Sequence, residues 1–377
     1  MGILDDIELS GVCPRTSDES LENASAIHGS MHEWRNYVSA ESEPEIVLSL
    51  LRAQRDKGHC EFLPTRAEVC RVLGVDSFEM SKIALISKAK PDGTLKHRLI
   101  WDMRRSGINN KIRLGERIVL PRLQDVVEDT LAVWRQGGHN PEYMVIDIAD
   151  AFHNIPIRDR ERQYAVAAIS GVYCVFRVMA MGAKSSPGVW GRFAAMLGRF
   201  VASVVAGYNA RVQIYVDDPI VVTAGPPGDR SRAFGIALMA LAAFGFPLAW
   251  TKAVAGSQLA WIGAQIQADS ATVTISIPED KVAALLAEIR SIQRKSLAPV
   301  AQLRSFCGKL SFVAGLLLPV RPFLDVLWAG ILLPSRRNAE WVSTSRIKVA
   351  LGWLHALLAG AHGVLSFKAP FVVEPAP

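Results

Sequence analysis

Val212–Val222 reads V-Q-I-Y-V-D-D-P-I-V-V and lies past the middle of a 377-residue chain. Two runs of β-branched and aromatic residues flank the adjacent acids Asp217 and Asp218. This pattern predicts a β-hairpin with carboxylates at its tip. Aspartate is also a common turn former, so the pair alone does not distinguish an ordinary turn from a functional site.

A third acid, Asp147, ends the apolar run Y-M-V-I and is followed by I-A-D-A-F-H-N-I-P-I. A buried strand that ends in a carboxylate, together with a hairpin that presents two more, can hold two divalent cations. Two-metal phosphoryl transfer requires such an arrangement, with cations about 3.5–4 Å apart that bridge the attacking and leaving oxygens. The three acids therefore predict a phosphoryl-transfer site.

Y-V-D-D after the D-I-A-D-A-F block resembles the catalytic core of reverse transcriptases of the retrotransposon and retrovirus type, and the resemblance runs from about Lys82 to Leu332. It implies an α+β right-hand polymerase fold with fingers, an antiparallel-sheet palm and an α-helical thumb. It also implies primer-dependent DNA synthesis on an RNA or DNA template, with a DNA primer, dNTPs and Mg²⁺ or Mn²⁺, by a fragment of a retroelement polyprotein.

The resemblance assigns roles to five residues around the cations. Asp147 would bind both cations, and Asp217 would be the second shared ligand. Asp218 matches the weaker third carboxylate, and Ile148 would offer its backbone carbonyl. Lys252 matches a lysine that protonates the pyrophosphate leaving group, and such general acid catalysis contributes about 10²–10⁴-fold.

Ile83–Trp101 reads as two strands around a Pro-Asp-Gly turn, a sequence suited to turns because proline presets φ and glycine accepts positive φ. The hairpin resembles the fingers of the family. Arg98 matches the triphosphate-binding arginine, and the second contributor is either Lys88 or Lys90. Cationic groups are what a polyphosphate leaving group requires.

Several further positions match the substrate-binding parts of the family. Phe152 occupies the place of the aromatic gate, whose ring would collide with a ribose 2′-hydroxyl and so select deoxynucleotides by exclusion. Met181 and Gly182 stand where the second motif contacts the nucleotide, although the family usually has Pro followed by Gln or Phe before the glycine, and this chain has Ala180 and Met181. Asp150 is expected to be a structural or substrate-contacting acid.

The primer side of the site is also implied by the resemblance. Tyr215 would pack near the primer end, and Trp261 and Gly263 match the primer grip. Pro219 departs from the family pattern, and a proline there removes a backbone N–H where the second hairpin strand should begin to pair.

Charge is unevenly distributed along the chain, although the net charge is only +6. Residues 1–80 hold 15 acids and 7 Lys or Arg, whereas residues 81–122 hold 11 Lys or Arg and 3 acids, and residues 279–348 hold 11 and 5. Two basic regions on either side of an acidic centre suit a protein that binds a phosphate backbone. A solvated basic face is the alternative.

Five scattered cysteines without a C-x-x-C pair argue against a zinc site or a disulfide framework and favour an intracellular setting. The N-terminus lacks the features of a secretory signal. The apolar stretch Val313–Leu333 contains Arg321, Asp325 and two prolines, so it predicts a buried helical hairpin and no membrane span. The sequence carries no signal for an oligomeric state.

Composition and motifs together predict four regions. Residues 1–45 are expected to be a disordered acidic leader, and residues 46–142 to form N-terminal helices and the fingers. Residues 143–275 would form the palm, with part of the fingers at 158–185. Residues 276–377 would form a helical thumb and the start of a connection region, and we expect no RNase H domain.

Two other functions remain open. An RNA-dependent RNA polymerase would share the palm and its cations, but Phe152 argues against it because such enzymes leave room for the 2′-hydroxyl. A degenerate fragment that binds nucleic acid without chemistry is favoured by Ala180, Met181, Pro219 and the missing RNase H.

Overall fold

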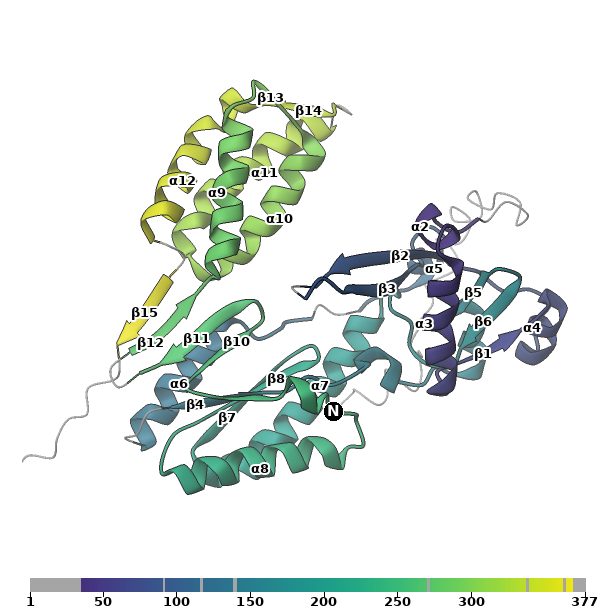
Figure 1. Cartoon of the computed structure of the whole chain (residues 1–377), viewed down its shortest axis with the longest axis horizontal. Helices are drawn as coiled ribbons and strands as arrows, with labels where there is room; N and C mark the ends of the chain where they lie inside the picture. The colour runs from purple at the N-terminus through teal and green to yellow at the C-terminus, as the bar shows by residue number, and fades with distance from the viewer. Residues whose placement is uncertain are drawn as a thin grey trace, which may run out of the picture. The chain divides into compact units, whose positions relative to one another are not determined.

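The computed structural model of the chain describes residues 35–90, 92–115, 118–137, 141–269, 272–336, 339–361 and 364–368 (Figure 1). The chain divides into two compact units. Unit 1 comprises the residues up to Leu120 and Ile148–Leu197, and unit 2 comprises Pro121–Asp147 and the residues from Gly198 onward. Within the described ranges all sheet strands pair antiparallel, and helices accompany them in both units, which agrees with the predicted α+β class. The predicted division at 142/143 and 275/276 does not coincide with these units and stays a prediction.

Unit 1 begins with helices α2 (Val38–Glu41), α3 (Pro44–Asp56) and α4 (Arg66–Leu73). The last of these has a sequence signal at each of its ends. Thr65 Oγ1 accepts a hydrogen bond from the Glu68 N–H at 3.2 Å, and Gly74 adopts the left-handed conformation with φ of 65°. These are an N-cap and a helix-ending glycine, respectively.

The predicted disordered leader, residues 1–45, lies partly within the described residues. Residues 1–34 lie outside the described residues, but residues 35–45 are ordered, which corrects that prediction. Tyr37 N–H donates to the Ile83 carbonyl at 3.0 Å, and Asn36 Oδ1 accepts from the Ile83 N–H at 2.9 Å. Ala40 is fully buried, so a short apolar contact and two backbone hydrogen bonds hold a segment whose composition is mostly polar.

Unit 1 contains the predicted hairpin and a separate three-stranded sheet. The hairpin is β2 (Lys82–Ala89) with β3 (Leu95–Asp102), and Thr94 N–H and Oγ1 both donate to Asp92 Oδ1 in its turn. The sheet has the order β1-β6-β5. Its strands are Cys60–Leu63 (β1), Val166–Ile169 (β5) and Val172–Phe176 (β6).

The stretch Val172–Ala180 provides one strand, β6. Strand β6 finds its partners upstream, in β5 and β1, because the chain leaves the sheet after Phe176. The remaining elements of unit 1 are short: α5 (Ile108–Lys111) and the 3₁₀-helices η4 (Ala151–Asn154) and η5 (Asp159–Tyr164).

His153, on η4, is a half-buried histidine that should make unit 1 sensitive to acid. Burial is the main cause that lowers its pKa to about 4, and the nearby His59 and Lys57 act in the same direction. Since the unfolded side chain titrates near pH 6.5, the unfolded state binds more protons between pH 6.5 and 4, and stability is lost as the pH falls through that window.

We expect this histidine to cost on the order of 3 kcal/mol of stability between pH 7 and pH 4. Denaturation of unit 1, followed at both pH values, should show a smaller loss in His153→Phe than in the unchanged protein. Equal losses in the two proteins would contradict the assignment.

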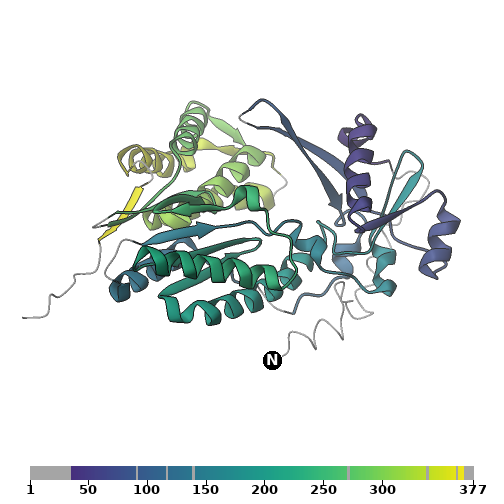
Figure 2. The same ribbon diagram turned by 60° about the horizontal axis from the view of Figure 1, so that its bottom comes forward.

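Unit 2 is built on a four-stranded sheet of order β7-β8-β4-β9. Its strands are Ala210–Tyr215 (β7), Asp218–Thr223 (β8), Glu142–Val145 (β4) and Val254–Gly256 (β9). The hairpin predicted from Val212–Val222 is therefore confirmed as β7–β8. Helices α6 (Leu123–Gly137) and α8 (Pro227–Ala243) accompany this sheet, and helix α7 (Ser186–Val205) begins in unit 1 and ends in unit 2 (Figures 1 and 2).

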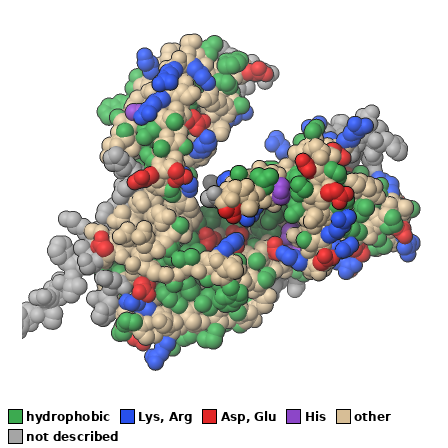
Figure 3. All heavy atoms as spheres, viewed as in Figure 1, with side chains coloured by type: hydrophobic (Ala, Val, Ile, Leu, Met, Phe, Trp, Pro, Cys, Tyr) green, Lys and Arg blue, Asp and Glu red, His purple; other side chains and the backbone are tan. Residues whose placement is uncertain are grey.

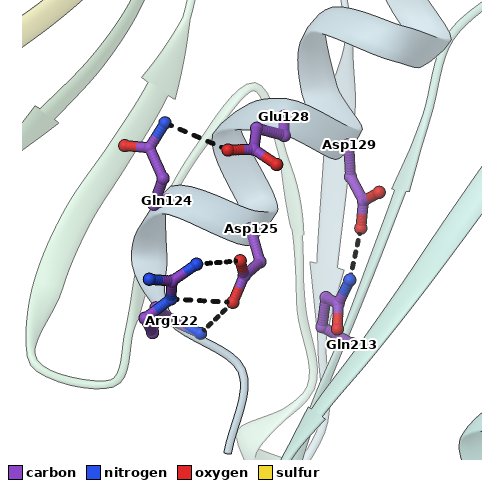
Figure 4. A network of polar contacts seen from close by, with 6 residues as sticks. All are labelled: Arg122, Gln124, Asp125, Glu128, Asp129 and Gln213. Carbon is purple, nitrogen blue, oxygen red and sulfur yellow. Dashed lines mark hydrogen bonds and ion pairs between the residues drawn. The ribbon is translucent and has the colours of Figure 1, made fainter.

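Helix α6 is tied to the hairpin by a polar contact. Gln213 Nε2 on β7 donates to Asp129 Oδ2 on α6 at 2.7 Å (Figure 4). Burial raises the pKa of Asp129, and the hydrogen bond from Gln213 opposes that shift. Where α6 begins, the Arg122 backbone N–H donates to Asp125 Oδ2 at 2.6 Å, and the Arg122 guanidinium pairs with the same carboxylate. Helix α6 thus holds β7, the strand that leads to the acidic tip of the hairpin.

Helix α7 continues into residues 206–208, and Ser186–Tyr208 is long and apolar enough to cross a membrane by length and composition alone. Its buried positions recur every three to four residues, as on a helix packed along one side of a core. They include Trp190, Ala194, Leu197 and Val201. This pattern is typical of a core helix.

A second antiparallel sheet of unit 2 has the order β10-β11-β12-β15. Its strands are Gln258–Trp261 (β10), Ala264–Ala268 (β11), Thr272–Ser276 (β12) and Val364–Lys368 (β15). The 3₁₀-helices Ala206–Tyr208 (η6) and Trp250–Lys252 (η7) precede β7 and β9. The turn between β10 and β11 belongs to the predicted primer grip.

The C-terminal part of unit 2 is a helical bundle, as predicted for the thumb. Its helices are α9 (Glu279–Gln293), α10 (Val300–Leu316), α11 (Arg321–Arg336) and α12 (Lys348–Ala361). The short strands β13 (Leu297–Pro299) and β14 (Trp341–Ser343) and the 3₁₀-helices η8 (Leu318–Val320) and η9 (Thr344–Arg346) connect them. The hairpin of α10 and α11 confirms the prediction for Val313–Leu333.

Lys and Arg side chains are prominent on the face of the bundle drawn in Figure 3. The basic side chains of α9 and α10 are not equivalent. Lys309 Nζ binds Glu288 Oε2 at 2.8 Å, and Arg290 Nε donates to His355 Nε2 at 3.2 Å. Lys309 is therefore already neutralised by a carboxylate and is a weaker candidate for a phosphate contact than the sequence indicates.

Candidate active site

The tip of the β7–β8 hairpin is a two-residue turn that displays the predicted acids. Tyr215 pairs with Asp218, and Val216 and Asp217 form the turn between them. Val216 has φ of 56°, a left-handed conformation that is strained for a β-branched residue. Strain of this kind persists only where the surrounding structure enforces it, which is common at functional sites.

Strand β4 delivers Asp147 to the same place. Val145 pairs with Ile220, and the Ile146 N–H donates to the Pro219 carbonyl at 3.3 Å. Ile146 thus faces Pro219, and the next pair in this register sets Asp147 opposite Asp218. The Asp147 carbonyl accepts from the Ala249 N–H at 2.8 Å, which anchors the residue from its other side.

Pro219 does not interrupt the hairpin, contrary to the expectation from sequence. It pairs with Ile214 of β7, while its carbonyl accepts from Ile146. A residue in an antiparallel ladder exchanges both of its backbone bonds with the same neighbour. The missing N–H of Pro219 therefore faces Ile146, just beyond the end of β4, and leaves the β7–β8 ladder intact.

The three carboxylates repel one another. The pKa of Asp218 is raised to about 7, first by burial and then by the charges of Asp147 and Asp217, while Lys252 acts in the opposite direction. The Lys252 ammonium forms an ion pair with Asp147 Oδ2, and the Asp147 side chain is 24% exposed. A partly buried cluster of like charges, balanced by one ammonium group, is an environment that favours a cation.

The donor set fits Mg²⁺ or Mn²⁺, which prefer carboxylate and carbonyl oxygens. In the described ranges no three His, Cys, Asp or Glu side chains already stand as a ready-made metal site. Asp147 is engaged by Lys252 instead. Binding of divalent cations would therefore exchange this internal ion pair for metal ligation, and Asp147, Asp217 and Asp218 are the side chains that would hold the cations. Ile148, whose side chain is buried, begins the stretch assigned to unit 1.

Trp261 supports the hairpin tip with a buried side chain, and its predicted place in the primer grip stays a prediction. Its side chain is only 1% exposed, and its Nε1–H donates to the Asp218 carbonyl at 3.0 Å. The Tyr215 and Trp261 rings meet edge to face with centroids 6.3 Å apart. A buried indole N–H needs an acceptor, and sequence spacing gives no sign of which carbonyl supplies it.

Gly263 lies in the turn after Trp261 with φ of 89°, and its carbonyl accepts from Lys281 Nζ at 2.8 Å. Lys252, the last predicted catalytic residue, lies on η7 and also belongs to unit 2. Tyr215, Trp261 and Gly263 of the predicted primer side belong to the same unit.

The predicted nucleotide-binding residues belong to unit 1. Ile86 pairs with Arg98 and Lys88 pairs with Lys96, so these side chains share one face of the β2–β3 hairpin. Lys88, Lys96 and Arg98 are all exposed. Lys90 lies beyond the last strand pair, in the turn, and is farther along the hairpin from Arg98 than Lys88 is. The register therefore favours Lys88 as the partner of Arg98. Sequence reasoning missed Lys96, which strand alternation would have indicated.

Phe152 is half-buried on η4, and Met181 is 44% exposed. Gly182 has φ of 125°, and its carbonyl accepts from Asn109 Nδ2 at 2.9 Å. Asn109 Oδ1 also accepts from the Lys184 N–H at 2.7 Å. Asn109 therefore holds the loop that precedes α7, a role that its sequence context alone did not reveal.

Gly182→Ala should destabilise unit 1 by about 2 kcal/mol or more. An added Cβ would lie 2.2 Å from the Trp101 carbonyl oxygen, so the loop would have to move. Gly188→Ala is the matched control, since nothing lies within 4 Å of a Cβ there and alanine favours the helix. Denaturation midpoints compare the variants, and a Gly182→Ala protein as stable as the control would contradict this geometry.

Comparisons with known proteins agree with this site. Residues 92–266 match the family described as reverse transcriptase (RNA-dependent DNA polymerase). No curated protein matches the chain. Among solved structures, the foamy viral protease-reverse transcriptase dRH in complex with double-stranded DNA matches with a TM-score of 0.56 and 14% identity, over 94% of this chain and 56% of that one.

The likeness to that structure confirms the predicted polymerase fold, and this chain spans about half of its length. The matched segment 92–266 includes the fingers strand β3, Asp147, the hairpin tip and Lys252. Residues 92–266, which include the acids gathered at the hairpin tip, are therefore similar to the reverse transcriptase (RNA-dependent DNA polymerase) family, and the chain has the fold of a viral reverse transcriptase.

Proposed function

We propose that the chain is a template- and primer-dependent DNA polymerase that extends a DNA primer with dNTPs on an RNA or DNA template. We further propose that it derives from a retroelement polyprotein. The observation that carries the proposal is the meeting of Asp147 with Asp217 and Asp218 at one end of the β7-β8-β4-β9 sheet. Three acids that are distant in sequence but share a partly buried site are the arrangement that two-metal phosphoryl transfer requires.

In this proposal Asp147 and Asp217 hold both divalent cations, and Asp218 and the Ile148 carbonyl complete the ligand set. Bound cations would lower the charge that develops on the attacking and leaving oxygens. Lys252 Nζ, which pairs with Asp147 in the structure, is the proton donor for the pyrophosphate leaving group. The ion pair with Asp147 keeps the protonated amine of Lys252 beside the three carboxylates.

Arg98 and Lys88, with Lys96 beside them, would bind the triphosphate of the incoming nucleotide. Phe152 would exclude the ribose 2′-hydroxyl. Tyr215 and the Gly263 turn would seat the primer end, with Trp261 holding the backbone of Asp218 in place.

Primer extension on an RNA template, with dNTPs or rNTPs supplied separately, tests the proposal. We expect Mg²⁺- or Mn²⁺-dependent extension with dNTPs only. Extension with rNTPs alone would support an RNA-dependent RNA polymerase instead. Salt-sensitive binding of the duplex without any extension would support the degenerate, binding-only alternative, which the intact pairing at Pro219 now favours less than the sequence did.

A further inference from the structure

The turn that carries Phe152 is a strained element that depends on outside contacts. It runs from Asp150 to Asn154 and begins with Asp150 at φ of 52°. The His153 and Asn154 N–H groups donate to the Asp150 carbonyl at 2.7 and 3.2 Å, and the Ile155 N–H donates to the Phe152 carbonyl at 3.2 Å. A non-glycine residue in the left-handed region is stable only when its surroundings fix it.

Two contacts from one neighbouring segment fix this turn. Lys57 Nζ binds Asp150 Oδ2 at 2.5 Å, with the two side chains 51% and 29% exposed. On the inner side, the His153 ring lies between His59 and Phe176, with ring centroids 5.2 and 5.9 Å away. One contact holds the start of the turn, and the other holds the residue directly after Phe152.

The segment that makes these contacts is itself firmly held. Lys57 ends α3, and the His59 N–H donates to the Gln54 carbonyl at 3.0 Å. The His59 ring is oriented by a hydrogen bond between its Nδ1 and Gln54 Oε1 at 2.8 Å, and its carbonyl accepts from the Arg177 N–H at 2.9 Å. Helix α3 therefore fixes the positions of Lys57 and His59, and these two residues fix the position of the turn within unit 1.

We propose that Lys57 is a positioning residue that, together with the packing of His59 on His153, sets the orientation of Phe152 and hence the strength of ribose exclusion. The inference rests on the proposed function, because it assigns the source of selectivity at the same site. Lys57 and His59 both lie outside the segment 92–266 that matches the family.

Lys57 can act in this way without contributing much to folding. A half-exposed ion pair adds little to global stability, so its loss should leave the fold intact. A small displacement of an aromatic ring at a substrate pocket has a larger effect, since misplacement by about 1 Å can change a rate by about 10²-fold. The consequence of losing Lys57 should therefore appear in selectivity rather than in stability.

The first test compares the full chain with its Lys57→Ala and Lys57→Arg variants. The measured quantity is the ratio of kcat/KM for a dNTP to that for the matching rNTP in primer extension. We expect Lys57→Ala to lower this ratio on the order of tenfold and Lys57→Arg to restore it. Arg52→Ala is the control, because Arg52 lies on the same helix and only approaches Glu45, at 4.0 Å.

The second test does not depend on catalysis. Hydrogen exchange at the amides of His153, Asn154 and Ile155 should be faster in Lys57→Ala, and unchanged in Lys57→Arg and Arg52→Ala. If the unaltered chain extends no primer, the proposed function fails, and the exchange rates still decide whether Lys57 holds the turn. Unchanged selectivity or unchanged exchange in Lys57→Ala would overturn the inference.

Discussion

Asp217→Asn is expected to lower the rate of Mg²⁺-dependent primer extension on the order of 10³-fold or more. The change keeps the shape of the side chain and removes one of the three charges at the hairpin tip. Because Asp217 raises the pKa of Asp218 by repulsion, the fold should not suffer from its loss. Single-turnover extension measures the rate, and circular dichroism measures folding.

Asp325→Asn is the matched control, since Asp325 is an exposed acid on α11, within the helical bundle. It should extend a primer at the rate of the unchanged chain. If Asp217→Asn also kept that rate while remaining folded, Asp217 would have no part in catalysis, and the assignment of the active site to the hairpin tip would be contradicted.

Phe152→Ala should reduce the preference for dNTPs over rNTPs by about 10²-fold, because exclusion of a hydroxyl is the only discrimination that the ring provides. The kcat/KM for dNTPs should fall by a smaller factor than the factor by which the kcat/KM for rNTPs rises. The measurement is the ratio of kcat/KM for the two nucleotides. Phe200→Ala is the control, since Phe200 is 40% exposed on α7 and meets the Phe244 ring edge to face, with centroids 5.0 Å apart. An unchanged ratio in Phe152→Ala would refute the gate.

Local signals explain what the sequence predicted well. The β7–β8 hairpin, the β2–β3 hairpin and the Thr65 and Gly74 ends of α4 each follow from residues within a few positions of one another. Turn chemistry and capping act over that range, so one sequence contains the whole cause. The meeting of Asp147 with Asp217 and Asp218 needed the family resemblance as well.

The details that the sequence left undecided depend on register and burial. The side to which Pro219 presents its missing N–H is decided by strand alternation relative to β4. Whether Trp261 faces a primer or the core depends on packing, and its indole hydrogen bond to the Asp218 carbonyl crosses 43 positions of sequence. The choice of Lys88 over Lys90 likewise follows from the pairing of Ile86 with Arg98.

The ion pair between Lys252 and Asp147 joins structure to mechanism. The sequence predicted both residues for the active site but not that they would bind each other. Without metal ions, the ammonium group of Lys252 balances the charge of Asp147 beside two further carboxylates. The pair therefore has to open when cations bind.

The most direct measurement is anomalous scattering from Mn²⁺ in crystals of the chain with primer, template and an incoming dNTP. The account predicts two peaks about 3.5–4 Å apart, both in contact with Asp147 and Asp217, with Lys252 released from Asp147. A complex with nucleotide bound and no Mn²⁺ peak at these carboxylates would contradict it.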